Sequence, residues 1–160
     1  MIVLGIDPGT HRMGYGVVRK EGGRQVFVDA GLVTIKTKNG FGALLDIKNE
    51  LEKIIKKFKP RAVAIEKIYF SKNVKTAIAV AQARGVAILA ALENGVEVRE
   101  FGPNEVKGSI TGYGLADKKA VLKMVKLTLN EPDLMVIDDA SDALALAIIC
   151  INRLGSKIPQ

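Results

Sequence analysis

The chain has 160 residues, 48% of them hydrophobic, which suits one folded domain and excludes a disordered chain. Its 24 Lys and Arg residues outnumber its 17 Asp and Glu residues, so the net charge is +7. A basic chain of this kind favours a polyanionic partner such as nucleic acid. The single cysteine, Cys150, excludes a disulfide framework and indicates a reducing compartment, which we expect to be the cytoplasm. No apolar run is expected to approach the length of a membrane span.

In chain order, the first three elements predict an antiparallel meander. Residues 1–7 are apolar on both faces, as in a central strand. Residues 14–20 and 24–37 predict two more strands, and Gly22-Gly23 between them is a turn signal.

The remainder predicts helices that alternate with strands. Apolar residues recur at helical spacing in the first of these segments, and Pro60 lies just beyond its end. The expected elements are a helix over 42–59, a strand over 62–66, an Ala-rich helix over 73–95, a strand over 96–101 and helices over 116–129 and 138–154. This order predicts a single α/β domain over 1–160, with a five-stranded mixed sheet flanked by helices on both faces.

Two of the predicted strands end on a carboxylate. Because side chains alternate along a strand, Gly5 and Asp7 share one face of the first strand. Ala64 and Glu66 likewise share one face of the strand over 62–66. If these strands are parallel neighbours, both acids project from the carboxyl edge of the sheet, where open α/β sheets place ligands. The small residue two positions before each acid leaves room for a closely packed helix.

The last predicted helix carries an acidic pair on the same stripe as apolar residues. The stripe, at spacings of three and four, comprises Asp139, Asp142, Leu146 and Ile149. Its apolar part should pack on the sheet, which would carry the two helix acids toward the two strand-end acids. Taken singly, an Asp at a helix start is commonly a cap, and an Asp before Pro-Gly is commonly a turn residue.

Four converging carboxylates repel one another unless a cation neutralises them. Oxygen ligands without histidine or cysteine suit Mg²⁺ or Mn²⁺. Two such ions, about 3.5–4 Å apart, can clamp the attacking and leaving oxygens of a phosphodiester. The pattern therefore predicts a metal site formed by Asp7, Glu66, Asp139 and Asp142.

Five segments carry a family resemblance: LGIDPGTHRMGYGV, AIEKIYFSKN, QARGVAIL, VKGSITGYGLADKKAV and DDASDALALAI. Together they resemble the RuvC family, crossover-junction endodeoxyribonucleases with an RNase H-like fold that resolve Holliday junctions. The resemblance implies that the four acids are catalytic metal ligands. It also implies symmetric nicking of two strands of a four-way DNA junction with Mg²⁺, by a homodimer, in recombination and repair. RuvA and RuvB, the branch-migration proteins, are the implied partners.

The chain departs from the family pattern at the first helix acid. The family usually has one acid, two small residues and the second acid, whereas here Asp138 precedes Asp139. Asp138 and Asp142 are four residues apart and could also share a face. The DASDALA register favours Asp139.

Candidate DNA contacts lie in two segments. Lysine side chains bind phosphates, so Lys72 is a candidate phosphate contact. Aromatic rings stack on unpaired bases, so Tyr69 is a candidate stacking residue. The resemblance assigns the stacking role to Tyr69. Lys107, Lys118 and Lys119 flank the glycine-rich GSITGYGLAD, where backbone can approach phosphate. By resemblance, Lys107 and Lys118 match family positions near the scissile strand.

Two other classes of function remain open on the sequence. DPGTHRMGYGVV also resembles the first phosphate loop of actin, hexokinase and Hsp70-like ATPases. Those proteins duplicate the domain and bind ATP between the copies, whereas this chain has no internal repeat. A junction-binding module without catalysis is the third class, and it leaves clustered acids beside DNA unexplained.

A homodimer would supply two symmetric sites for the two equivalent strands of a junction. The Ala-rich segment 76–92 has small side chains suited to close helix contact, so we expect the interface there. The alternative is that its alanines only pack on the sheet.

Overall fold

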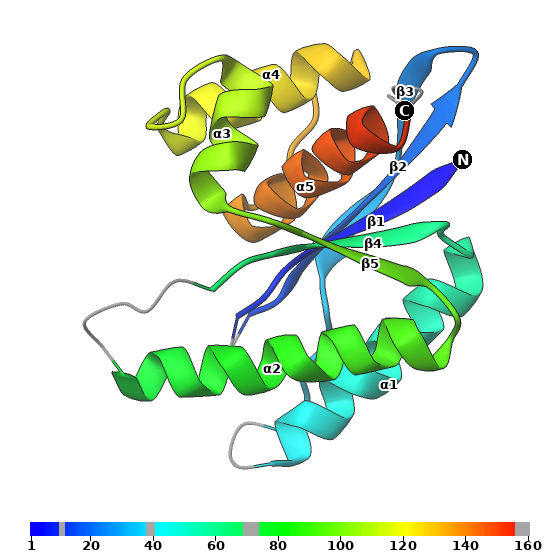
Figure 1. The fold of residues 1–160 in the computed structure, drawn as a ribbon, viewed down its shortest axis with the longest axis vertical. Coiled ribbons are helices and arrows are strands. Elements are labelled where there is room, and N and C mark those ends of the chain that lie inside the picture. Colours follow the sequence, from blue (N-terminus) through cyan, green and yellow to red (C-terminus); the bar gives the residue numbers. More distant parts are fainter. Residues whose placement is uncertain (10–11, 38–40, 69–73, 156–160) are drawn as a thin grey trace, which may run out of the picture.

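The computed structural model describes residues 1–9, 12–37, 41–68 and 74–155. Within these ranges, the chain forms five strands and five helices (Figure 1). The strands are β1 (Ile2–Asp7), β2 (Gly14–Glu21), β3 (Arg24–Leu32), β4 (Ala62–Glu66) and β5 (Glu97–Phe101). The helices are α1 (Gly42–Phe58), α2 (Val74–Glu93), α3 (Pro103–Thr111), α4 (Lys118–Leu129) and α5 (Asp138–Gly155).

The strands form one mixed sheet, as the sequence predicted, and their order is β3-β2-β1-β4-β5. The β1–β2 and β2–β3 pairs are antiparallel, whereas β1–β4 and β4–β5 are parallel. Strands β1 and β4 are therefore parallel neighbours. Ile6 pairs with Ile65, so Asp7 and Glu66 follow side by side at the carboxyl edge.

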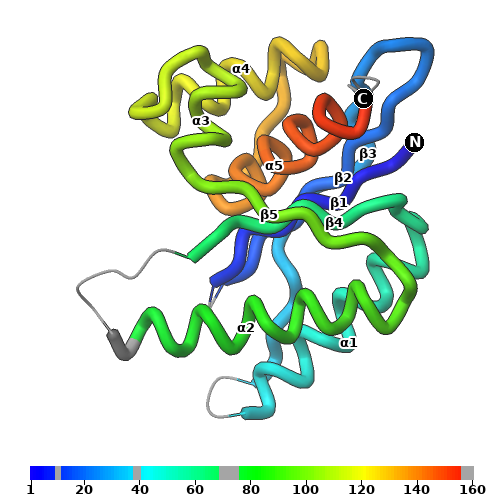
Figure 2. The backbone as a smooth tube through the Cα atoms, in the orientation of Figure 1, coloured from blue at the N-terminus to red at the C-terminus, as the bar shows by residue number. Residues whose placement is uncertain are grey.

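Helices cover both faces of the sheet, which confirms the predicted architecture. Figure 2 shows α3, α4 and α5 on one side and α1 and α2 on the other. Side chains alternate between two cores: Val3 and Ala64 face the α5 side, whereas Leu4 and Ile65 face α1 and α2. The strand-end acids continue the alternation of Val3 and Ala64, so they belong to the α5 side.

Two elements differ from the prediction. Strand β3 ends at Leu32 rather than 37, because its partner β2 begins at Gly14, opposite Leu32. Beyond it, the amides of Lys36 and Thr37 donate to the Asp46 carboxylate of α1, at 2.9 and 2.7 Å. These bonds direct the chain toward α1 instead of along the sheet.

Helix α3 is the element that sequence reasoning missed. It starts with Pro103, whose fixed φ suits a first helical turn. The Glu105 carboxylate accepts a hydrogen bond from the Gly102 amide at 3.2 Å, which closes that turn. The helix is short and buries one residue, Val106, so its apolar periodicity is weak.

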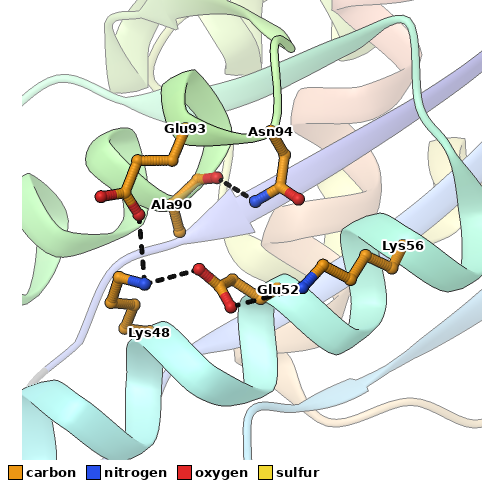
Figure 3. Close-up of polar contacts among 6 residues, drawn as sticks. All are labelled: Lys48, Glu52, Lys56, Ala90, Glu93 and Asn94. Carbon is orange, nitrogen blue, oxygen red and sulfur yellow. Dashed lines mark hydrogen bonds and ion pairs between the residues drawn. The ribbon is translucent and has the colours of Figure 1, made fainter.

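Helix α2 lies along α1 on the far side of the sheet from α5. The two helices are joined by Lys48, whose ammonium lies 3.1 Å from Glu93 and also contacts Glu52 (Figure 3). The alanines Ala83, Ala87, Ala90 and Ala91 are buried, so these four pack inward.

The expectation about membrane spans was wrong for α2. By length and composition alone, residues Thr76–Glu93 could cross a membrane, although only 22% of this segment is buried. A single helix of this kind is weak evidence of a membrane span, and the segment lies against α1 here. What the finding establishes is an apolar helix with a largely exposed surface.

Helix α5 touches the backbone of β1 and β2 directly. A Cβ atom added to Gly5 would overlap the Ala143 carbonyl oxygen, and one added to Gly16 would lie 2.6 Å from the Leu144 nitrogen. Gly14 faces the backbone of Asp139 in the same way. The predicted close approach of a helix behind the strand-end acid is thus confirmed at Gly5.

Gly5→Ala should destabilise the fold by about 1–3 kcal/mol, because the new methyl group meets helix backbone that has no free space to move. Gly108→Ala is the matched control, since its added carbon would lie 3.7 Å from Gly114, an ordinary contact. Removing a helical glycine there should stabilise the chain by up to about 1 kcal/mol. Urea unfolding of both variants measures the difference, and equal stabilities would contradict the close-packing interpretation.

Candidate active site

Four acids gather where β1 and β4 end beneath the start of α5. The pKa of Asp7 is raised to about 8, mainly because the carboxyl group is buried. The second cause is nearby negative charge, from Asp142, Glu66 and Asp139. The structure therefore brings together all four acids that the sequence singled out.

Burial also raises the pKa of Glu66, and the charge of Asp142 adds to the shift. The pKa of Asp142 is raised by burial, although Lys118 opposes the change. Three acids of the cluster are thus held where their ionised forms are disfavoured. A site of this kind gains stability from a bound cation.

Two basic side chains partly neutralise the cluster. Arg12 Nε lies 3.0 Å from Asp139 Oδ2. Lys118 Nζ lies 3.5 Å from Asp142 Oδ2 and 3.7 Å from Asp138 Oδ2. Sequence reasoning missed Arg12, because no spacing rule connects residue 12 with a helix that begins more than a hundred positions later.

The geometry separates the two candidates for the first helix acid. The Asp138 side chain is 71% exposed, whereas that of Asp139 is 26% exposed. Asp139 is also the one whose charge acts on Asp7. Asp139 is therefore the acid that faces Asp7, whereas Asp138 is more exposed and acts on the cluster through Asp142 and Lys118.

The donor set suits a hard divalent cation, since it consists of carboxylate oxygens around a buried, negatively charged point. The carboxylates are not arranged as the ligands of one ion. Among the described residues, no three Asp, Glu, His or Cys side chains are grouped closely enough to hold a metal. Two of these acids are instead paired with basic residues, Asp139 with Arg12 and Asp142 with Lys118. Charge and chemistry fit a metal, provided that the carboxylates turn inward.

A cavity of about 200 Å³ opens beside the acids, between α3, α4 and α5. Its lining includes Glu66 and Asp142 together with Lys107 and Lys118. Two of the predicted DNA-contacting lysines thus share a cavity with two of the acids.

The other predicted contacts are not gathered there. Lys119 lines a separate hollow on the outer surface of α4, with Leu122, Lys123 and Lys126. Tyr69 and Lys72 lie outside the described residues. Their predicted roles stay predictions.

The sheet order, the helices on both faces and the acids at the edge shared by β1, β4 and α5 define an RNase H-like nuclease fold. The family profile for the crossover junction endodeoxyribonuclease RuvC matches residues 3–150. The chain therefore belongs to the RuvC family.

Individual relatives agree with this assignment. The chain is 48% identical to the RuvC of Ruminiclostridium cellulolyticum over 161 aligned positions, which cover 99% of this chain and 97% of the relative. The structure of Thermus thermophilus RuvC is similar with a TM-score of 0.85, at 31% identity and 98% coverage of both chains. The same protein in complex with a Holliday junction substrate gives a TM-score of 0.88, at 31% identity, covering 98% of this chain and 97% of the other.

Asp7→Asn should stabilise the metal-free protein by at least about 1 kcal/mol at pH 7, which is about 2–4 °C in Tm. The unfolded chain ionises Asp7 near pH 4, whereas the folded chain disfavours that charge up to about pH 8. The gain should therefore grow as the pH rises from 4 to 8. Asp133→Asn, at an exposed turn, is the control and should change little. A lower Tm for Asp7→Asn would contradict the proposed electrostatic strain.

Proposed function

We propose that this chain resolves Holliday junctions in homologous recombination and DNA repair, by metal-dependent, symmetric nicking of two strands. The observation that carries the proposal is the convergence of Asp7, Glu66, Asp139 and Asp142 beside a lysine-lined cavity. Membership in the RuvC family supports it, and favours a nuclease over an ATPase or a non-catalytic module. We treat residues 1–160 as one nuclease domain in the cytoplasm.

The four acids would hold Mg²⁺, or Mn²⁺ in its place, with two ions per site. When bound, such ions lower the pKa of a water molecule and neutralise charge on the phosphate. Asp7 is the central ligand of this proposal, because it is the acid on which the other three charges act.

The basic residues would act on the DNA. Lys118 contacts Asp142 and lines the cavity with Lys107, so either ammonium can reach a phosphate placed there. A cation at developing negative charge lowers the barrier more than it tightens substrate binding. Tyr69, Lys72 and Lys119 would contact the junction farther from the acids.

We propose that α2 forms the interface of a homodimer, with a different set of residues from the alanines. Ile78, Leu89 and Leu92 are 56%, 48% and 58% exposed, and helical spacing puts them on one stripe. Exposed apolar stripes of this kind favour association. A two-fold dimer would present two acid clusters to the two equivalent strands. RuvA and RuvB remain the proposed partners in branch migration.

Asp142→Asn tests the nuclease proposal. The variant keeps the shape of the side chain but loses the charge, so nicking of a synthetic four-way junction in Mg²⁺ should fall by at least about 100-fold. Junction affinity and folding should be retained, since one negative charge near the phosphates is removed.

Asp138→Asn is its matched control, because Asp138 is one helical turn away on α5 and contacts the same lysine. It should nick at close to the wild-type rate. Normal nicking by Asp142→Asn, or a loss only in Asp138→Asn, would contradict the assignment.

Leu89→Arg tests the dimer. A charge in the centre of the apolar stripe should shift the protein from dimer to monomer at micromolar concentration, measured by sedimentation equilibrium. Junctions nicked in one strand should then accumulate. Met135→Arg, at a 94% exposed position away from α2, is the control and should remain dimeric. A monomeric wild type with full resolution activity would rule out this part of the proposal.

A further inference from the structure

Arg84 of α2 reaches the end of β4 from the sheet face opposite the acids. Its Nε donates a hydrogen bond to the Glu66 carbonyl oxygen at 2.9 Å. Its Nη2 forms an ion pair with Glu100 of β5, on the α2 side of the sheet. The Arg84 side chain is 17% exposed and its hydrogen bond to the Glu66 carbonyl is partly buried, whereas the Glu100 side chain is 44% exposed. One guanidinium thus joins α2, β4 and β5.

The peptide group between Glu66 and Lys67 is held at both of its ends. The Lys67 N–H donates to the Phe101 carbonyl of β5 at 2.9 Å, while the Glu66 C=O accepts from Arg84. Because a peptide group is planar, two hydrogen bonds on opposite sides fix its orientation. The direction in which Glu66 leaves the backbone is fixed with it.

The donor to this carbonyl lies outside the sheet, on α2. In a trans peptide the C=O points away from the N–H, so the Glu66 carbonyl is directed from β5 toward β1. Strand β1 ends at Asp7, and the next residue, Pro8, has no N–H. Arg84 supplies the hydrogen bond that a continued β1 would otherwise provide.

We propose that Arg84 is a positioning residue that aims the Glu66 carboxylate into the acid cluster by fixing its peptide group. The bidentate shape of the guanidinium lets it hold the carbonyl and Glu100 together, which the single ammonium of a lysine does less well. The inference rests on the proposed role of Glu66 as a metal-binding acid. It also gives α2 a direct physical connection to the site.

The experiment compares Arg84→Met with Arg84→Lys in the full chain. Arg84→Met should lower the kcat for a saturating four-way junction by about 10–100-fold and raise the Mg²⁺ concentration needed for half-maximal nicking. The junction Kd should stay within about twofold, since Arg84 lies on the other face of the sheet from the acids. Arg84→Lys should recover part of the kcat.

Hydrogen exchange in the metal-free protein gives a readout independent of activity. The Lys67 amide should exchange faster in Arg84→Met, because its peptide group has lost one of two anchors. Lys48→Met is the matched control: it removes the ion pairs of Lys48 with Glu52 and with Glu93, which is the last residue of α2 and lies nine positions after Arg84 (Figure 3). It should leave kcat, the Mg²⁺ requirement and Lys67 exchange unchanged.

Wild-type kcat and Mg²⁺ requirement in Arg84→Met would overturn the proposal, as would equal losses in Arg84→Met and Lys48→Met. If Arg84→Met fails to fold, Arg84→Lys and Glu100→Gln replace it. Glu100→Gln keeps the carbonyl bond and should lose less than fivefold in kcat. If the wild type nicks no junction, the proposed function fails, while Lys67 exchange still tests the contact of Arg84 with the Glu66 peptide.

Discussion

The contact between α5 and the backbone of β1 and β2 is the constraint on which the rest of the molecule depends. With Gly5, Gly14 and Gly16 at the contact, helix backbone lies directly on strand backbone. The distance between helix and sheet is then set by main-chain atoms, which compress little. This fixes the height at which the first turns of α5 present their acids to the edge of the sheet. A helix held off by side chains would carry those acids away from Asp7.

The acid cluster is an unfavourable arrangement that the fold maintains. Burial and mutual repulsion both disfavour its charges, and the basic residues Arg12, Lys107 and Lys118 oppose this effect. Large apolar cores on both faces of the sheet provide the stability to hold the acids together. Electrostatic strain of this kind is typical of sites where a cation is bound during function. Two of the carboxylates are paired with positive charge, Asp139 with Arg12 and Asp142 with Lys118.

The two faces of the sheet carry different surface features. The α5 face carries the acids and the lysine-lined cavity, whereas α2 presents an exposed apolar stripe on the opposite side. Arg84 crosses between them, because it belongs to α2 and contacts the backbone of Glu66. Arg84 thus connects α2 to the end of β4 through a partly buried hydrogen bond from a charged side chain. Association through α2 and chemistry at the acids would share this connection.

The alternation of residues in β1 and β4, and the spacing of three and four in α5, determined the element types and the face on which each acid lies, because local periodicity specifies local geometry. It could not decide between Asp138 and Asp139, which differ only in their direction relative to the sheet. The sequence also could not show that Lys118 lines the cavity and Lys119 does not. Neighbouring helix positions point to different surfaces, and which surface lies beside the acids depends on how α4 packs in the folded chain. In α2, apolar residues surround the helix, so only packing against α1 showed that alanines face inward and Leu89 outward. The contacts of Arg12 and Arg84 join segments remote in sequence, and only the folded chain brings those segments together.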